Sequence, residues 1–330
     1  MMWNIIGHDW AVNLLSEQIA RGRIHHAYLI TGPSGVGRRT LALRIAQALN
    51  CTQPPQKGSP CLKCNTCTQI FQMAFPDLAI IQADQRGGTI KVDQVRQIQR
   101  SLILAPYSAN YRVAIFLRFE ETSKSAANAL LKTLEEPAAQ VVLILTAESA
   151  QLLPPTIVSR CEILRLRPLP TVQINQWLQE SGDIPPEESL KLAHLSSGKP
   201  GTAIKFLETP HLLLQRNKWL DEHINLLSAG RIERFTYAES ISRPKDRLQE
   251  MISIWLTLWR DVLINNSGAV ISVSNLNHKN EIERLSSRLN QEEILHIVTK
   301  LENTLTLLGK NVNPRLAAEV MMLDLPFVRV

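Results

Sequence analysis

Residues 28–40 of the chain, YLITGPSGVGRRT, decide the fold that the sequence predicts. A short apolar run, a glycine-rich turn and the start of a helix follow one another here, which is the setting of a phosphate-binding P-loop, G-x-x-x-x-G-K-[ST]. Gly32 and Gly37 match the glycine frame of this motif, and Gly35 lies between them. The stretch therefore predicts an α/β domain with this turn at the end of its first buried strand.

Two positions of this motif hold residues that do not suit its chemistry. Arg38 stands in place of the lysine that reaches the β- and γ-phosphates, and Arg39 stands in place of the hydroxyl that binds Mg²⁺. An arginine is planar, forked and bulkier than a lysine. Thr40 lies one residue further along the helix, about 100° around its axis, so it does not replace the hydroxyl. We expect no ATP hydrolysis here, and the sequence leaves ATP binding open.

The overall composition is that of a soluble globular protein. The 330 residues suggest two or three domains, with 45% hydrophobic and 20% charged residues. A formal charge of +6 is compatible with nucleic acid nearby but does not require it. The first residues lack the pattern of a signal peptide, and no apolar run approaches the roughly 20 residues of a membrane span. We expect a cytoplasmic protein with no membrane partner and with reduced cysteines.

Four of the five cysteines lie close together, at Cys51, Cys61, Cys64 and Cys67. In a reducing compartment such spacing indicates a metal site, and four thiolates make a closed structural Zn²⁺ site. The surrounding insert, about 51–67, has too few apolar residues for a core of its own, so a metal would supply folding energy. The alternatives are four free cysteines by chance and an iron–sulfur cluster, for which the fourth cysteine of the ferredoxin run is missing.

Strands and helices alternate after the cysteines. Apolar runs at 78–82, 112–117 and 141–146 predict buried strands, and helices are expected at 90–104 and through 126–134. This alternation predicts a parallel sheet. In P-loop ATPases the strand that corresponds to 112–117 ends in acidic residues that hold Mg²⁺. Here Leu117 and Arg118 occupy that end, which again argues against hydrolysis.

Several motifs in one order resemble the AAA+ subunits of bacterial DNA polymerase III clamp loaders. The helix SAANALLKTLEEP at 125–137 resembles their signature helix, and SRC at 159–161 resembles their SRC motif. The four cysteines resemble their zinc module. The turn at 198–203 resembles the start of their sensor 2 helix, and 313–319 resembles the last helix of their collar domain. The resemblance covers most of the chain and is weak between about 210 and 300.

Within that family, tau and gamma motor subunits keep the P-loop lysine, the hydroxyl and the acidic pair, whereas the delta-prime class keeps the fold without hydrolysis. The departures at Arg38, Arg39, Leu117 and Arg118 all fall on catalysis, so the chain looks like the delta-prime class. The resemblance implies a pentameric ring with tau/gamma and delta subunits that loads the sliding clamp onto primer-template DNA. The alternative is an ATP-hydrolysing, tau/gamma-like motor with a divergent P-loop, in which Arg38 and Glu120 take altered roles.

The resemblance also assigns a role to Arg160, which we expect in a short helix over 156–161. Arginine fingers can act in trans, and a subunit that does not hydrolyse ATP has no use for one at its own site, so we expect Arg160 to reach the γ-phosphate of ATP bound by an adjacent motor subunit. The alternative is a structural arginine that pairs with a local carboxylate. A third function, a DNA-reading zinc finger, lacks both the C₂H₂ pattern and a following basic helix.

Three domains are expected from the proline-rich breaks in the chain. Residues 1–167 would form the AAA+ α/β domain with its zinc insert, residues 168–208 a helical lid, and residues 209–330 an all-helical collar. Within the collar, apolar residues recur at helical spacing between Ile252 and Leu263, which predicts a core-facing helix. Residues 267–280 are expected to form a long loop.

Overall fold

The computed structural model describes every residue except 1, 86, 183, 270–272, 311 and 329–330. The chain forms two compact units. Unit 1 comprises Met1–Glu180 and Gly198–Thr202, and unit 2 comprises Ser181–Ser197 and Ala203–Val330. The three-domain division at 1–167, 168–208 and 209–330 stays a prediction.

A five-stranded parallel sheet forms the centre of unit 1, as the alternation of apolar runs predicts. Its strands are β1 (Ala27–Thr31), β2 (Leu78–Ile81), β3 (Arg112–Phe116), β4 (Val141–Ala147) and β5 (Glu162–Arg165). The spatial order is β2-β3-β4-β1-β5, and every neighbouring pair is parallel. Strands β1 and β4 are buried along their whole length, which explains why each is a continuous apolar run.

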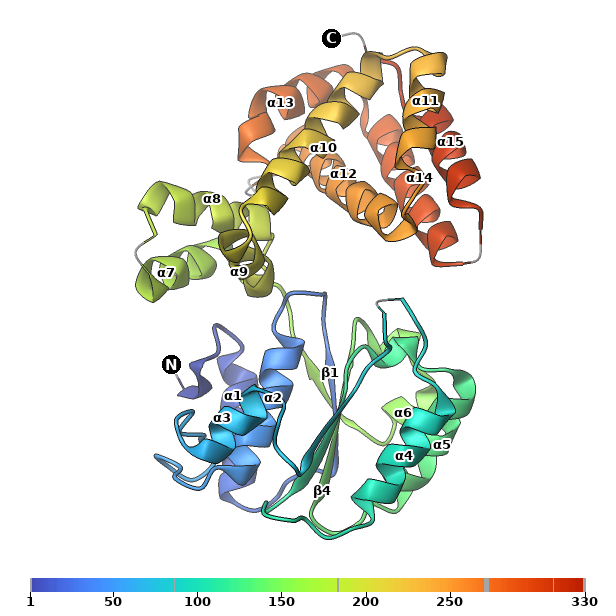
Figure 1. The fold of residues 1–330 in the computed structure, drawn as a ribbon. Helices are drawn as coiled ribbons and strands as arrows, with labels where there is room; N and C mark the ends of the chain where they lie inside the picture. Colours follow the sequence, from blue (N-terminus) through green and yellow to red (C-terminus); the bar gives the residue numbers. More distant parts are fainter. Residues whose placement is uncertain (1, 86, 183, 270–272, 311, 329–330) are drawn as a thin grey trace. The chain divides into compact units, whose positions relative to one another are not determined.

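Helices cover both faces of this sheet (Figure 1). They are α1 (Asp9–Ala20), α2 (Arg38–Asn50), α3 (Asn65–Phe71), α4 (Val92–Leu102), α5 (Lys124–Glu135) and α6 (Pro155–Val158), with short 3₁₀ turns η1 (Met2–Asn4), η2 (Phe119–Glu121) and η3 (Ala150–Leu152). Helix α7 (Thr171–Ser181) follows β5 and does not lie on the sheet. Alternate residues of β1 face opposite layers. Tyr28 and Ile30 pack into the cluster with α1 and α2, whereas Leu29 packs into the cluster with α4 and α5.

Unit 2 is helical apart from its loops. Its elements are α8 (Pro186–Ser196), α9 (Pro200–Glu208), α10 (His211–Ser228), α11 (Arg231–Ile241), α12 (Lys245–Asn266), η4 (Leu276–His278), α13 (Lys279–Arg288), α14 (Gln291–Gly309) and α15 (Pro314–Asp324). The apolar stripe predicted between Ile252 and Leu263 lies on α12, and its members Trp255 and Trp259 are fully buried. Core packing of that stripe is therefore confirmed.

Two predicted boundaries differ from the structure by a few residues. Helix α4 begins at Val92 because Ile90 instead pairs with Thr122 in a β-bridge, which holds its backbone extended. The loop expected over 267–280 is shorter, since η4 begins at Leu276 and α13 begins at Lys279. Residues 270–272 of that predicted loop lie outside the described part of the chain.

In the part of the chain that the structure describes, no helix combines the length and the apolar character needed to cross a membrane.

Candidate metal and nucleotide sites

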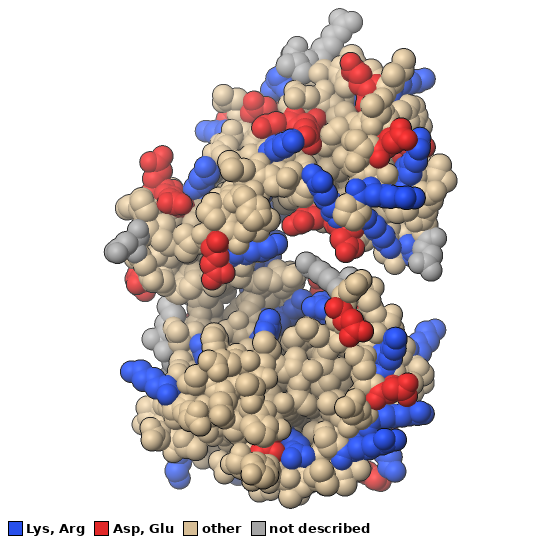
Figure 2. Space-filling model, in the orientation of Figure 1, with Lys and Arg blue, Asp and Glu red and all other residues tan. Residues whose placement is uncertain are grey.

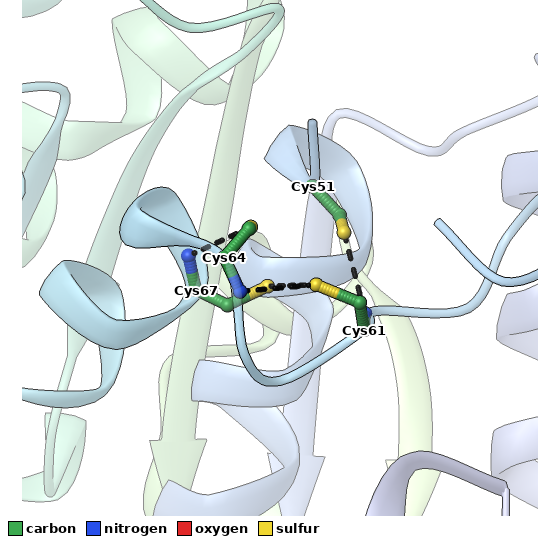
Figure 3. A group of neighbouring side chains, drawn as sticks. All are labelled: Cys51, Cys61, Cys64 and Cys67. Carbon is green, nitrogen blue, oxygen red and sulfur yellow. Dashed lines mark hydrogen bonds between the residues drawn. The ribbon is translucent and has the colours of Figure 1, made fainter. Parts of the chain in front are cut away.

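The four predicted metal ligands converge in unit 1 (Figure 3). Cys51 follows the last residue of α2, Cys64 precedes α3, Cys67 lies in the first turn of α3, and Cys61 comes from the loop between these helices. Their sulfur atoms all lie within 4.8 Å of one another, and the Sγ atoms of Cys61 and Cys67 are 4.0 Å apart. Helix packing thus brings together residues that are up to 16 positions apart in the sequence.

Backbone N–H groups already point at three of these sulfurs. Cys61 N donates to Cys51 Sγ and Cys64 N donates to Cys61 Sγ, each at 3.2 Å, and Cys67 N donates to Cys64 Sγ at 3.5 Å. Donors of this kind stabilise the thiolate form that a metal requires. The chain around the cysteines is therefore arranged to carry negative charge on sulfur.

The spacing of the sulfurs fits a tetrahedral ion. Zn–S bonds of about 2.3 Å place the sulfurs of a tetrahedral site about 3.8 Å apart, so only small shifts separate the present geometry from a closed Cys₄ site. Burial opposes ionisation of Cys64, but hydrogen bonds from Thr52 and from the Cys67 backbone lower the pKa of this thiol to about 6. Burial raises the pKa of Cys51 and Cys67. The four cysteines could hold one zinc ion, which would displace the remaining protons.

The glycine-rich turn lies between β1 and α2, where the sequence places it. The φ angle of Gly32 is 147°, and a Cβ atom there would come within 2.4 Å of the Leu166 carbonyl oxygen. Gly37, at φ 110°, precedes the first residue of α2. Only glycine suits such positive φ angles and close backbone approaches. The glycines thus allow the backbone conformation of a phosphate loop, whichever residues follow them.

Arg38 faces a carboxylate inside this loop region. Its Nη1 lies 4.0 Å from Oε1 of Glu120, and the two side chains are only 10% and 18% exposed. Burial raises the pKa of Glu120, and the charge of Arg38 acts in the opposite direction. An internal carboxylate thus lies beside the cation that replaces the P-loop lysine. The sequence pattern did not predict that Glu120 contacts Arg38, because Glu120 lies in an irregular segment between β3 and α5.

The other catalytic positions offer no metal ligand. Leu117, at the end of β3, is buried and apolar, and the guanidinium of Arg118 pairs with Glu121 at 2.9 Å. Arg39 is exposed and its Nη2 donates to Met73 Sδ at 2.9 Å. Thr40 is also exposed on α2. The structure does not bring these residues together into an Mg²⁺ site.

Arg160 lies two residues beyond α6, so its prediction inside a short helix is wrong. Ser159 N donates to the Pro155 carbonyl in the last hydrogen bond of helical spacing, whereas Arg160 N donates to Ile157 only three residues back, in a turn. Arg160 Nη1 donates to the Thr156 carbonyl at 2.8 Å, and Nη2 donates to Glu135 Oε1 at 2.6 Å. The local carboxylate that the structural alternative requires is therefore present.

The surroundings of this ion pair are open. The side chains of Arg160 and Glu135 are 34% and 49% exposed, and both line an open cleft of about 740 Å³. The stacked rings of His25 and His26, 4.6 Å apart, lie in the same cleft. Sequence reasoning missed Glu135 as a partner, although its position at the end of the SAANALLKTLEEP helix was the available signal.

Comparison with known proteins shows the family to which the chain belongs. The family model described as "DNA polymerase III, delta subunit" matches residues 7–170. DNA polymerase III subunit gamma of Buchnera aphidicola subsp. Schizaphis graminum is 30% identical over 271 residues, which cover 79% of this chain and 73% of that protein. The chain belongs to the family of DNA polymerase III clamp-loader subunits.

Members of this clamp-loader family with different subunit names match the chain. DNA polymerase III subunit delta′ of Pseudomonas aeruginosa is 35% identical over 198 residues, covering 59% of this chain and 60% of that protein. Subunit tau of Salmonella typhimurium is 36% identical over 176 residues, covering 53% of this chain but 27% of that protein. The chain thus spans about a quarter of the tau relative, and relatives named delta′, gamma and tau all match it.

Proposed function

We propose that this clamp-loader subunit is of the delta-prime type, which takes part in loading the sliding clamp onto primed DNA without hydrolysing ATP itself. The observation that carries the proposal is the Arg38–Glu120 pair, in which a carboxylate of the chain lies beside the cation at the lysine position. Phosphoryl transfer depends on positioning of phosphates and Mg²⁺. Leu117 and Arg118 offer no carboxylate for that metal.

The proposed partners follow from the family. They are tau/gamma and delta subunits in a pentameric ring, with the sliding clamp and primer-template DNA reached through the complex, in the cytoplasm. The four cysteines would hold one structural Zn²⁺, with Cys51, Cys61, Cys64 and Cys67 as its ligands. The proposed degenerate nucleotide site comprises Gly32, Gly35, Gly37, Arg38, Arg39 and Thr40.

A second candidate is a tau/gamma-like motor in which Glu120 and Arg38 act in a divergent way. Its support is the proximity of these two side chains and the similarity to tau and gamma proteins. ATP turnover by the purified chain with Mg²⁺ separates the two candidates. Turnover near roughly 1 s⁻¹, within the ordinary range of enzymes, would establish the motor and exclude the delta-prime type.

Arg160 is the residue that we propose acts on a neighbouring subunit. Its ion pair with Glu135 is substantially exposed, and such surface pairs contribute at most about 1 kcal/mol. The arginine can therefore leave Glu135 at little cost. A guanidinium on the rim of an open cleft can approach a phosphate of an adjacent subunit and bind two of its oxygens.

The test is steady-state ATP hydrolysis by the complex reconstituted with partner subunits. We expect Arg160→Ala to preserve assembly but to reduce DNA- and clamp-stimulated hydrolysis, because losing a finger slows the site it serves by about 10³–10⁵-fold. Arg160→Lys should also be defective, since it lacks the fork. Glu135→Gln is the matched control, because it breaks the same ion pair but keeps the arginine.

The control variant distinguishes the two roles of Arg160. A finger predicts loss with Arg160→Ala and normal rates with Glu135→Gln. Equal losses with both variants would assign the ion pair a structural role only. Normal rates with Arg160→Ala would remove the arginine from the mechanism altogether.

A further inference from the structure

Arg44 is a buried cation next to the cysteine cluster. It lies on α2 and is 9% exposed, and its Cζ atom is 5.9 Å from the ring centroid of Phe71 on α3. Its Nη1 donates to Gln47 Oε1 at 2.8 Å. Burial lowers the pKa of Arg44, while charge on Cys67 acts to raise it. The guanidinium is thus held between the helices that carry the proposed metal ligands.

No carboxylate explains the presence of this cation. Among the residues that the structure describes, Arg44 forms no ion pair with an aspartate or glutamate, and its Nε has no hydrogen-bond partner. Removing a charge from water is unfavourable, so buried charges are usually paired with opposite charges. We therefore expect a negatively charged group near the guanidinium of Arg44.

Hydrogen bonds connect Arg44 to the cysteines. Arg44 and Gln47 are three residues apart on α2, so they lie on one face of this helix, which packs against α3. Gln47, which is 1% exposed, donates from Nε2 to the Cys67 carbonyl oxygen at 2.7 Å. The amide of Gln47 therefore joins the guanidinium on α2 to the ligand-bearing turn of α3.

A Zn²⁺ ion with four thiolates carries a net charge of −2. We propose that Arg44 is the internal counter-charge of the zinc–tetrathiolate centre and that Gln47 holds it in position. The inference rests on the zinc site of the proposed function. Groups around a metal site orient its ligands and commonly change metal affinity by about 10–100-fold. Arg44 is therefore a positioning residue whose charge favours the metal-bound state.

Two substitutions of similar length separate charge from packing. Arg44→Met removes the charge and Arg44→Lys keeps it. We expect Arg44→Met to weaken zinc binding by the full chain about 10–100-fold, as measured by competition with a chromophoric chelator, and Arg44→Lys to retain most of the affinity. Arg96→Met is the control, because the Arg96 side chain is 62% exposed on α4.

Each outcome decides the matter. Wild-type affinity in Arg44→Met would overturn the inference, and equal weakening in Arg44→Met and Arg44→Lys would assign Arg44 to packing. Wild-type protein without zinc would instead overturn the proposed metal site itself. If neither Arg44 variant folds, Arg44→Gln supplies the test, because its amide keeps a hydrogen-bond donor but carries no charge. Weakened zinc binding would then support the inference, and unchanged binding would refute it.

Discussion

Arg38 shows how one residue changes the electrostatics of a phosphate loop. The N-terminus of a helix following a glycine-rich turn attracts anions through its free N–H groups and its dipole. Arg38 is the first residue of α2, and Glu120 lies beside its guanidinium. A carboxylate in that position competes with phosphate for the same cation and repels the negatively charged ligand. The loop keeps its backbone conformation, while Glu120 opposes the positive charge of Arg38.

Restoring the lysine by itself should not restore catalysis. We expect Arg38→Lys to leave ATP turnover at the background rate, because exposed Arg39 and buried Leu117 still provide neither the hydroxyl nor the carboxylate that hold Mg²⁺. The measurement is phosphate release by the purified chain with ATP and Mg²⁺. Substantial turnover by this single variant would show that Leu117 is not a lost metal ligand.

Arg234 illustrates a residue whose role is to stabilise helix ends. This buried side chain donates hydrogen bonds to the carbonyls of Leu226 and Leu227 at the end of α10. It also donates to the carbonyls of Leu325 and Pro326, just beyond α15. The last carbonyls of a helix have no partner within it and carry partial negative charge, so a cation satisfies both needs. One side chain on α11 thus ties together two helices distant in sequence.

At the scale of elements, α10 and α12 meet around a histidine. His223 on α10 is fully buried, and its ring stacks on Trp255 at 4.2 Å between centroids. Its Nε2 accepts a hydrogen bond from Trp259 Nε1 at 2.8 Å, so the ring is neutral with its proton on Nδ1. Burial, aided by the charge of Arg234, lowers the pKa of His223 to about 3. The packing of α10 on α12 depends on this neutral form.

The stability of unit 2 should therefore fall with acidity. In the unfolded chain the histidine titrates near about 6.5, whereas in the fold it remains neutral to about pH 3. Between these two pH values the unfolded chain binds a proton at this histidine and the folded chain does not. The free energy of unfolding therefore decreases by up to about 1.4 kcal/mol for each pH unit below about 6.5. His223→Gln keeps an acceptor for Trp259 and cannot be protonated. Between pH 6.5 and pH 5, we expect the free energy of unfolding to decrease by on the order of 2 kcal/mol less in this variant than in wild type.

Denaturant unfolding followed by tryptophan fluorescence at several pH values measures this difference. His296→Gln is the matched control, because His296 is exposed on α14 of the same unit. Parallel pH dependence in wild type and His223→Gln would contradict the assignment of acid sensitivity to this residue.

The whole molecule has two compact units, each with its own core. The cysteine cluster belongs to unit 1 alone, and it includes few apolar residues besides the cysteines themselves. On the visible face of unit 2, acidic and basic side chains lie next to one another (Figure 2). Ion pairs such as Arg315–Glu239 and Lys300–Asp324 belong to this unit. The described residues of this face, which is of mixed sign, therefore form no continuous basic patch of the kind that attracts DNA.

Zinc removal should consequently act locally. We expect a chelator, or Cys64→Ser, to raise amide hydrogen exchange across 51–71 while the sheet of unit 1 and all of unit 2 stay protected, because a metal supplies the folding energy only of its own module. Cys161→Ser is the control, since Cys161 lies outside the cluster and should leave zinc content at one ion per chain. Loss of protection throughout unit 1 would mean that the metal supports the whole sheet.

The sequence by itself determined the elements of this protein and the class of its sites. Apolar runs predicted the strands of a parallel sheet, and the glycines at 32 and 37 predicted the turn, because strand burial and positive φ are properties of short segments. The cysteine spacing indicated a metal site for the same reason. The start of α4 and the end of the loop before α13 were misplaced, since helix ends depend on neighbours such as the bridge at Ile90.

Only the tertiary structure decided which charged groups meet. Arg38 lies beside Glu120, 82 positions away in the chain, and Arg160 lies beside Glu135, 25 positions away. Gln47 donates to the carbonyl of Cys67, 20 positions away. Parallel strands require crossover connections, so residues at one edge of the sheet come from distant segments. Their proximity depends on strand order and helix packing, which periodicity does not encode. The roles proposed for Arg38 at the phosphate loop and for Arg44 beside the cysteines therefore depend on long-range contacts.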